Sequence, residues 1–334
     1  MGAYLLRRLF LILPTFLGIT LVTFLIIQLA PGNPVSIKIQ QLGGEGIKAE
    51  SISKAVVEQT KKLYGLDKPL HVQYGLWLHR LVHLDFGESY KDHRPVIAKI
   101  REALPITLLL NLISILLIYS ISIPMGIFSA VRLESVLDKV VTLGLFILYS
   151  LPSFWVAMLL IIYLGGGEYL DLFPVVGLVS QGYQSLPFLG KVGNLLWHLV
   201  LPVVVLTYGG FAFLARFARA QLLEVIRQDY IRTARAKGLS EGKVIFKHAL
   251  RNAMIPFVTL MGTLLPAMIG GSVIVEQIFS IPGMGRLGFE AVLSRDYPTI
   301  MAIAAIEAVL TLISLLISDV LYVLVDPRIS FEGT

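Results

Sequence analysis

Cysteine is absent from this sequence, and charged residues are few. The lack of thiols excludes disulfides, thiolate metal sites and cysteine nucleophiles. Charged side chains make up 15% of the chain, whereas a soluble globular domain carries about a quarter. Hydrophobic residues make up 56%, and a water-soluble protein of this length would need far more polar surface. The composition therefore indicates that a lipid bilayer is the solvent for most of the chain.

A complete nucleotide-binding loop is also missing. The nearest match starts at Gly238, but Gly242 follows one residue too early for a Walker A pattern, and Val244 replaces the magnesium-binding Ser or Thr. No Ser/His/Asp or paired-carboxylate arrangement is visible, because His198 and Glu307 lie in separate apolar runs. The sequence therefore shows no sign of an enzymatic site. If ATP is used at all, another subunit must bind it.

Six long apolar runs account for the shortage of charge. The first, 9–30, has no charged residue and is long enough to cross a hydrocarbon core, which takes about 20 residues of helix. It is too long for the apolar part of a cleaved signal peptide, and residues 28–30 do not form a small-x-small cleavage site. We therefore expect an all-α membrane protein with a retained first helix. The six predicted transmembrane helices are 9–30, 103–131, 140–164, 195–215, 253–275 and 298–325.

The distribution of basic residues predicts the orientation of these helices. Lys and Arg are concentrated in the short segments that would share one side of the membrane, namely Arg7, Arg8, Arg132, Lys139, the loop 216–252 and Arg328. The positive-inside rule places these segments, and both termini, in the cytoplasm. Residues 31–102 also hold many lysines, but long loops cross the membrane largely regardless of charge.

This topology divides the chain into three parts. Residues 1–30 form the cytoplasmic N-terminus and the first helix, and residues 31–102 form a small extracytoplasmic domain. Residues 103–334 form a five-helix core with the cytoplasmic loop 216–252. Four histidines fall in the second part, but no third ligand accompanies a pair with helical spacing, so we expect solvated or structural histidines rather than a metal site. They are His71, His79, His83 and His93.

The loop 216–252 carries the clearest local signals. We expect one helix from 216 to 237, ended by Gly238 in the left-handed position that follows a helix, with Lys237 near the negative end of the dipole. Ser240 is suited to cap the next helix, with Glu241 in its first turn. The pattern predicts an exposed helix–turn–helix elbow between two membrane helices. Such an elbow could not easily enter a DNA groove, and a plain basic loop would explain the charge but not the capping residues.

The segment Asp229–Pro256 resembles the EAA loop of ABC importer permeases, in the version found in dipeptide and oligopeptide permeases. It departs from the general pattern, since Arg232-Thr233-Ala234 replaces Glu-Ala-Ala and Arg251 replaces a proline, which is usual for the peptide branch. Further segments agree with the same family along nearly the whole chain. They are Tyr64–Leu70, Tyr74–Trp77, Phe86–Ser89, Pro95-Val96, Leu104-Pro105, Phe279–Gly285 and Arg295–Pro298.

The resemblance implies a type I ABC importer transmembrane domain in a prokaryotic inner membrane. Two permease subunits, here a related heteromeric pair, would form the pathway. Two ATPase subunits would hold ATP and magnesium, and an extracytoplasmic binding protein would deliver peptides. It implies no cofactor in this chain and no nucleic-acid partner. The residues that it assigns to coupling with the ATPase are Asp229, Ala234, Arg235, Ala236, Lys237, Gly238, Leu239 and Ser240.

Other assignments stay open at this point. Glu307, Gly270 and Gly271 could line the pathway or serve packing alone, and Glu276 is expected at a solvated helix end. The same family framework serves oligosaccharides, nickel chelates and glutathione as well as peptides. An ion-coupled secondary transporter is the alternative from another class, although no internal repeat or set of midplane carboxylates supports it.

Overall fold

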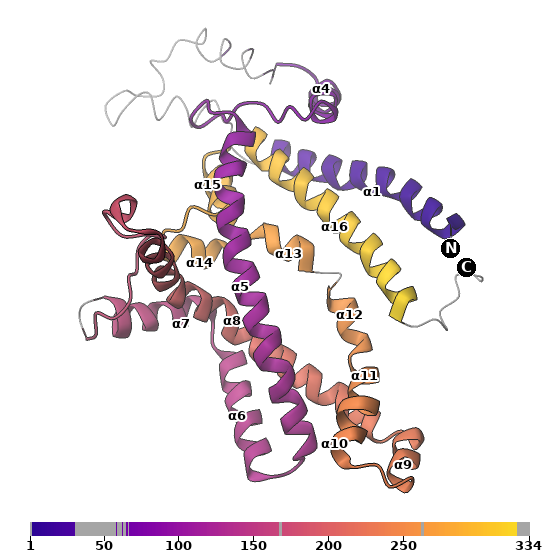
Figure 1. Cartoon of the computed structure of the whole chain (residues 1–334). Helices are drawn as coiled ribbons and strands as arrows, with labels where there is room; N and C mark the ends of the chain where they lie inside the picture. The colour runs from indigo at the N-terminus through magenta and orange to yellow at the C-terminus, as the bar shows by residue number, and fades with distance from the viewer. Residues whose placement is uncertain are drawn as a thin grey trace. The chain divides into compact units, whose positions relative to one another are not determined.

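The computed structural model describes residues 2–30, 58, 62, 65, 67–166, 169–261 and 264–325. Within these residues the chain is helical, and the only β pairing is one bridge between Glu88 and Pro95 (Figure 1). The long helices are α1 (Gly2–Leu29), α5 (Val96–Val131), α8 (Phe188–Ile226) and α16 (Tyr297–Val325). Each contains a segment long and apolar enough to cross a membrane. The predicted all-α class is confirmed for the described residues.

The predicted third span, 140–164, is not one straight helix. It consists of α6 (Val136–Ser150), α7 (Ser153–Leu160) and a π-helical turn (Ile161–Gly165), with a bend of 97° after α6. Pro152 explains the break, because proline lacks an N–H group and forces the residue before it out of the helical region. Leu151 is accordingly extended, with φ −83° and ψ 128°. Tyr208 on α8 donates a hydrogen bond of 2.7 Å to the Leu151 carbonyl.

The predicted fifth span, 253–275, is interrupted rather than continuous. Its described residues form short helices, and Gly271, at φ +66°, separates the last two. Glycine tolerates this left-handed conformation, and Ser272 then caps the next helix through the Val275 N–H group. The described chain therefore shows four unbroken candidate spans and one bent pair. The short helices are α11 (Leu250–Ala253), α12 (Ile255–Met261), α13 (Leu264–Gly270) and α14 (Val273–Ile278).

The chain divides into two compact units, which are described separately. The first comprises Met1–Pro105 and Met284–Ile313, and the second comprises Ile106–Gly283 and Ser314–Thr334. The first includes α4 (Leu70–Val82) and α15 (Met284–Leu293). Most of residues 31–66, which belong to the predicted extracytoplasmic domain, lie outside the described residues.

Asp296 is the polar centre of the first unit. Its buried carboxylate accepts hydrogen bonds from the Ser89 hydroxyl at 2.5 Å, the Tyr90 N–H at 2.8 Å and the Thr299 hydroxyl at 2.6 Å. The Lys99 ammonium lies 3.7 Å away. A buried charge is tolerated only when it is paired and hydrogen-bonded, and this one is. The network ties the segment before α5 to the start of α16.

Asp138 performs a similar role in the second unit. Arg219 of α8 donates two hydrogen bonds to its buried carboxylate, Nε to Oδ1 at 3.0 Å and an η nitrogen to Oδ2 at 2.9 Å. The Ser129 hydroxyl of α5 and the Glu134 N–H donate to the same carboxylate. Three helices, α5, α6 and α8, are thus joined through one side chain.

Glu276 is buried, which contradicts the expectation of a solvated helix end. The side chain is 1% exposed, and its Oε1 accepts a hydrogen bond of 3.0 Å from the Thr107 hydroxyl. A Cβ atom at Gly283 would lie 2.5 Å from both the Glu276 carboxylate and the Thr107 hydroxyl. The close approach explains the glycine in this turn, and the sequence shows no charge pattern that would have indicated the burial.

The Asp138 network generates a stability prediction. Replacing Asp138 by Ala leaves the Arg219 charge without its partner, so we expect a loss of about 3 kcal/mol in the free energy of unfolding. Denaturant unfolding in detergent would measure it. Glu102→Ala, which removes the exposed Arg94–Glu102 ion pair, is the control and should cause no measurable change. Equal stability of the two variants would contradict the role given to Asp138.

The contact at Gly283 generates a second prediction. Gly283→Ala should destabilise the protein by about 1–3 kcal/mol, because the added methyl group overlaps Glu276 and Thr107. Gly144→Ala is the matched control, since nothing lies within 4 Å of its added Cβ atom and alanine favours the helix. The same unfolding measurement applies, and a loss in both variants would show that the close approach is not the cause.

Candidate functional site

The elbow begins where α8 ends. We predicted one helix from 216 to 237, but α8 stops at Ile226 and α9 (Asp229–Ala236) starts anew after an extended Gln228, with φ −71° and ψ 149°. Asp229 in the first turn of α9 favours this new start, because its charge meets the positive end of the helix dipole. The prediction of one continuous helix is therefore wrong, because the chain breaks between α8 and α9. The elbow consequently has its own first helix, set off from α8.

The turn after α9 has the predicted geometry. Gly238 lies at φ +76°, and its N–H donates to the Arg235 carbonyl at 2.9 Å, while the Lys237 N–H donates to the Thr233 carbonyl at 3.1 Å. Ser240 is the residue before α10 (Glu241–Lys243), although its side chain makes no capping hydrogen bond. A π-helical segment, Val244–Ala249, then leads into α11. Glycine is needed at the turn because side chains strain this conformation.

The inner face of the elbow packs against its own chain. Ile231 and Ala234 of α9 are buried with Leu222 of α8 and with Val244 and Ala249 of the returning segment. Ile127 and Ala130 of α5 belong to the same cluster. Burial of this apolar surface holds α9 in one position. The elbow is thus a packed element of the second unit, as Figure 1 shows at the lower right.

An ion pair closes the elbow across the turn. Arg235 donates hydrogen bonds to Glu241, from Nε at 2.7 Å and from an η nitrogen at 3.3 Å. These hydrogen bonds lower the pKa of Glu241 below its ordinary 4.5. The carboxylate is therefore charged, and the pair is intact, from neutral pH down to the acid range. We assigned Arg235 to partner contact and did not predict its pairing, although opposite charges six residues apart across a glycine turn could have suggested it.

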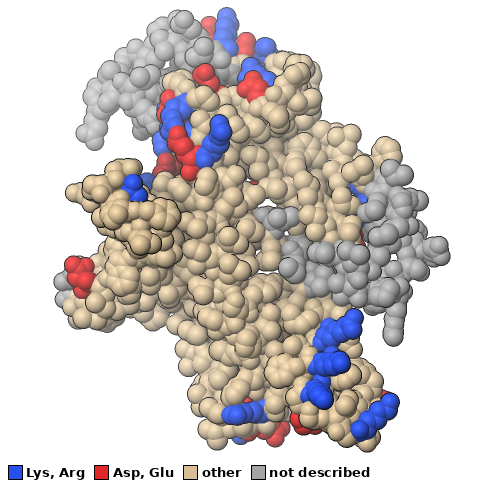
Figure 2. Space-filling model, viewed as in Figure 1, with Lys and Arg blue, Asp and Glu red and all other residues tan. Residues whose placement is uncertain are grey.

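The outer face of the elbow is exposed and basic. Figure 2 shows Lys and Arg side chains gathered over this part of the molecule. Of the eight residues predicted for coupling, Ala234 is buried in its own chain and Leu239 is half-buried against the same cluster. Ala234 is therefore covered by its own chain, whereas Leu239 keeps part of its side chain exposed. The six exposed residues are Asp229, Arg235, Ala236, Lys237, Gly238 and Ser240.

The predicted pathway residues fall in both units. Glu307 is half-buried on α16 in the first unit, whereas Gly270 is the last residue of α13 in the second unit and Gly271 follows it. His198 is buried, with its Nδ1 2.8 Å from the Asn194 carbonyl, and so has a structural contact. No cluster of three or more potential metal ligands occurs among the described residues.

Comparisons with known proteins cover nearly the whole chain. Residues 122–331 match the model of the binding-protein-dependent transport system inner membrane component, and residues 1–111 match that of the N-terminal part of such membrane components. The solved structure of the MetNI methionine ABC transporter, in inward-facing conformations, is similar with a TM-score of 0.53 at 18% identity. The match covers 70% of this chain and 99% of that one, and at this identity it supports the fold alone.

Curated relatives are similar over their full length. The oligopeptide transport system permease protein AppB of Bacillus subtilis (strain 168) is 43% identical, over 99% of this chain and 100% of the relative. The inner membrane ABC transporter permease protein YejB of Escherichia coli O157:H7 is 39% identical over 100% of both chains. The dipeptide transport system permease protein DppB of Escherichia coli (strain K12) is 37% identical over 98% of both. The chain therefore belongs to the family of binding-protein-dependent transport system inner membrane components, the permease subunits of ABC transporters, and is a transport subunit rather than an enzyme.

Proposed function

We propose that this chain is one of two permease subunits in an ABC importer for peptides, and that the α9–α11 elbow couples it to an ATPase subunit. Full-length similarity to the AppB and DppB permeases supports the peptide substrate. The family assignment also excludes the alternative hypothesis that the chain is an ion-coupled secondary transporter. Oligosaccharides, nickel chelates and glutathione remain the alternative cargoes for this framework.

The observation that carries the coupling role is the two-sided elbow. Its inner face is fixed to α5 and α8 by the buried cluster around Ile231, and its outer face presents charged side chains and the Gly238 turn. An element that is rigid on one side and exposed on the other can transmit a displacement. The residues that contact the ATPase are then Asp229, Ala236, Lys237, Gly238 and Ser240. Ala234 and Leu239 pack against the cluster on the inner face and hold these residues in position.

The proposed topology places six spans in the membrane, with both termini and the elbow in the cytoplasm. The interrupted segment from α11 to α14 supplies the fifth span, and interrupted helices are tolerated at membrane depth where protein or a water-filled cavity surrounds them. Residues 31–102 lie outside, where a binding protein delivers the peptide. The remaining partners are a related second permease and two ATPase subunits, which hold ATP and magnesium. Glu307, Gly270 and Gly271 are proposed to face the pathway.

The turn at Gly238 gives the first functional prediction. Gly238→Ala should lower the ATP hydrolysis that peptide-loaded binding protein stimulates by about tenfold, because a side chain costs about 1–2 kcal/mol in the left-handed conformation. Hydrolysis would be measured on the complex purified with its ATPase subunits. Gly242→Ala, at an exposed helical position where an added Cβ atom meets nothing within 4 Å, is the control. If no ATPase subunit co-purifies, or if both variants match the wild type, the coupling role is wrong.

The Arg235–Glu241 pair allows a charge-swap test. Arg235→Glu should weaken stimulated hydrolysis, since two carboxylates would then repel each other across the turn. The double variant Arg235→Glu with Glu241→Arg restores the pair and should recover most of the activity if the pair shapes the elbow. No recovery would indicate that Arg235 contacts the ATPase directly. In the wild type Arg235 lowers the pKa of Glu241, so the native pair should hold at neutral pH and break only in acid.

A further inference from the structure

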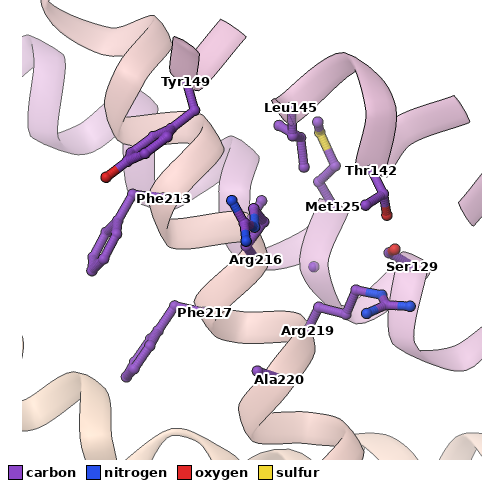
Figure 3. A pocket seen from close by; sticks show the side chains of 12 residues that line it. Met125, Ser129, Thr142, Leu145, Tyr149, Phe213, Arg216, Phe217, Arg219 and Ala220 are labelled. Atoms are coloured by element: carbon purple, nitrogen blue, oxygen red, sulfur yellow. The ribbon is translucent and has the colours of Figure 1, made fainter. Parts of the chain in front are cut away.

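A second candidate site lies away from the elbow. A cavity of about 600 Å³ opens between α5, α6 and α8 (Figure 3). Tyr149 and Phe213 line one end of it, and Ser129 and Arg219 line the other, with Arg216 projecting between them. The lining thus combines aromatic and apolar side chains with polar and cationic ones. This is the pattern that an amphiphilic ligand requires.

The two arginines of the cavity differ in whether an acidic residue pairs with them. Arg219 is committed to Asp138 through two hydrogen bonds, so its charge is neutralised within the chain. Arg216 is exposed, and no ion pair joins it to another residue in the described part of the chain. A cationic side chain beside aromatic walls favours an anionic ligand. Since Asp138 is already bound, the ammonium group of a peptide would find no free carboxylate here.

The surroundings of the cavity favour lipid as the source of that anion. At its back α5 and α8 touch, because a Cβ atom at Gly126 would lie 2.5 Å from the Ala215 carbonyl and 2.6 Å from the Ala218 Cβ atom. On α6 the residues beside the cavity wall expose large apolar side chains, with Leu143 60% and Phe146 57% exposed. A helix with such a surface lies against acyl chains or another apolar partner. The cavity is therefore flanked by a surface suited to lipid.

We propose that this cavity binds an anionic phospholipid of the inner leaflet, with its phosphate on Arg216 and an acyl chain against Leu145, Tyr149 and Phe213. Guanidinium groups bind phosphate in a bidentate manner, and basic pockets between membrane helices on the cytoplasmic side hold anionic headgroups. The proposal rests on the topology given under Proposed function, which places this end of α8 at the cytoplasmic surface. A bound lipid would fill the space beside the Asp138–Arg219 pair.

Native mass spectrometry tests the site. The purified complex is reconstituted in nanodiscs of phosphatidylcholine with a minor share of phosphatidylglycerol, released into mild detergent, and the retained phosphatidylglycerol is counted. Arg216→Gln should bind phosphatidylglycerol about fivefold more weakly than the wild type, as expected for the loss of one basic residue at the surface. Arg216→Lys, which keeps the charge, should retain most of the binding.

Lys139→Gln is the matched control, because Lys139 is an exposed cation on the first turns of α6 outside the cavity lining. Equal retention by wild type and Arg216→Gln, or an equal loss in Lys139→Gln, would overturn the lipid site. A loss of peptide transport in Arg216→Gln without a change in retained phosphatidylglycerol would assign the cavity to the pathway instead and would also overturn it. The count of lipids involves neither nucleotide nor binding protein, so its failure leaves the coupling proposal standing.

Discussion

The structure depends on one constraint, the need of every backbone polar group in a bilayer to find a partner within the protein. Long helices such as α5 and α8 meet it internally. The chain nevertheless breaks at Pro152 and at Gly271, and each break is accompanied by a specific compensation. Tyr208 donates to the Leu151 carbonyl, and Ser272 accepts from the Val275 N–H. Side chains that look like ordinary polar residues in the sequence are therefore part of the framework that permits irregular segments.

Hydropathy and turn chemistry predicted much of this architecture. The runs around α1, α5, α8 and α16 were found, because long apolar helices need no information beyond their own composition. The turn at Gly238 was also found, since left-handed backbone favours glycine. The breaks at Pro152 and Gly271 were missed, because apolar residues continue through both and periodicity does not register them.

Features that arise from distant contacts could not be read from local pattern. Glu276 looked like a solvated helix end, but it is buried and accepts a hydrogen bond from Thr107, which lies far from it in the sequence. Ala234 was assigned to a partner, although it packs within its own chain against the cluster around Ile231. In both positions the residue type allowed two environments, and only tertiary packing decides between them. The same holds for Arg216 and Arg219, which are neighbours in sequence but differ in pairing.

The cluster beneath the elbow has a mechanical consequence. Ile127 and Ala130 of α5 share it with Ile231 of α9, so two routes lead from the elbow into the membrane helices. One route follows the backbone from α9 through the break at Gln228 into α8. The other runs from α9 to α5 through the packed side chains of the cluster. A close-packed interior resists compression. If the elbow receives a displacement from an ATPase as proposed, it would therefore pass that displacement to α5 and α8 together rather than to one helix.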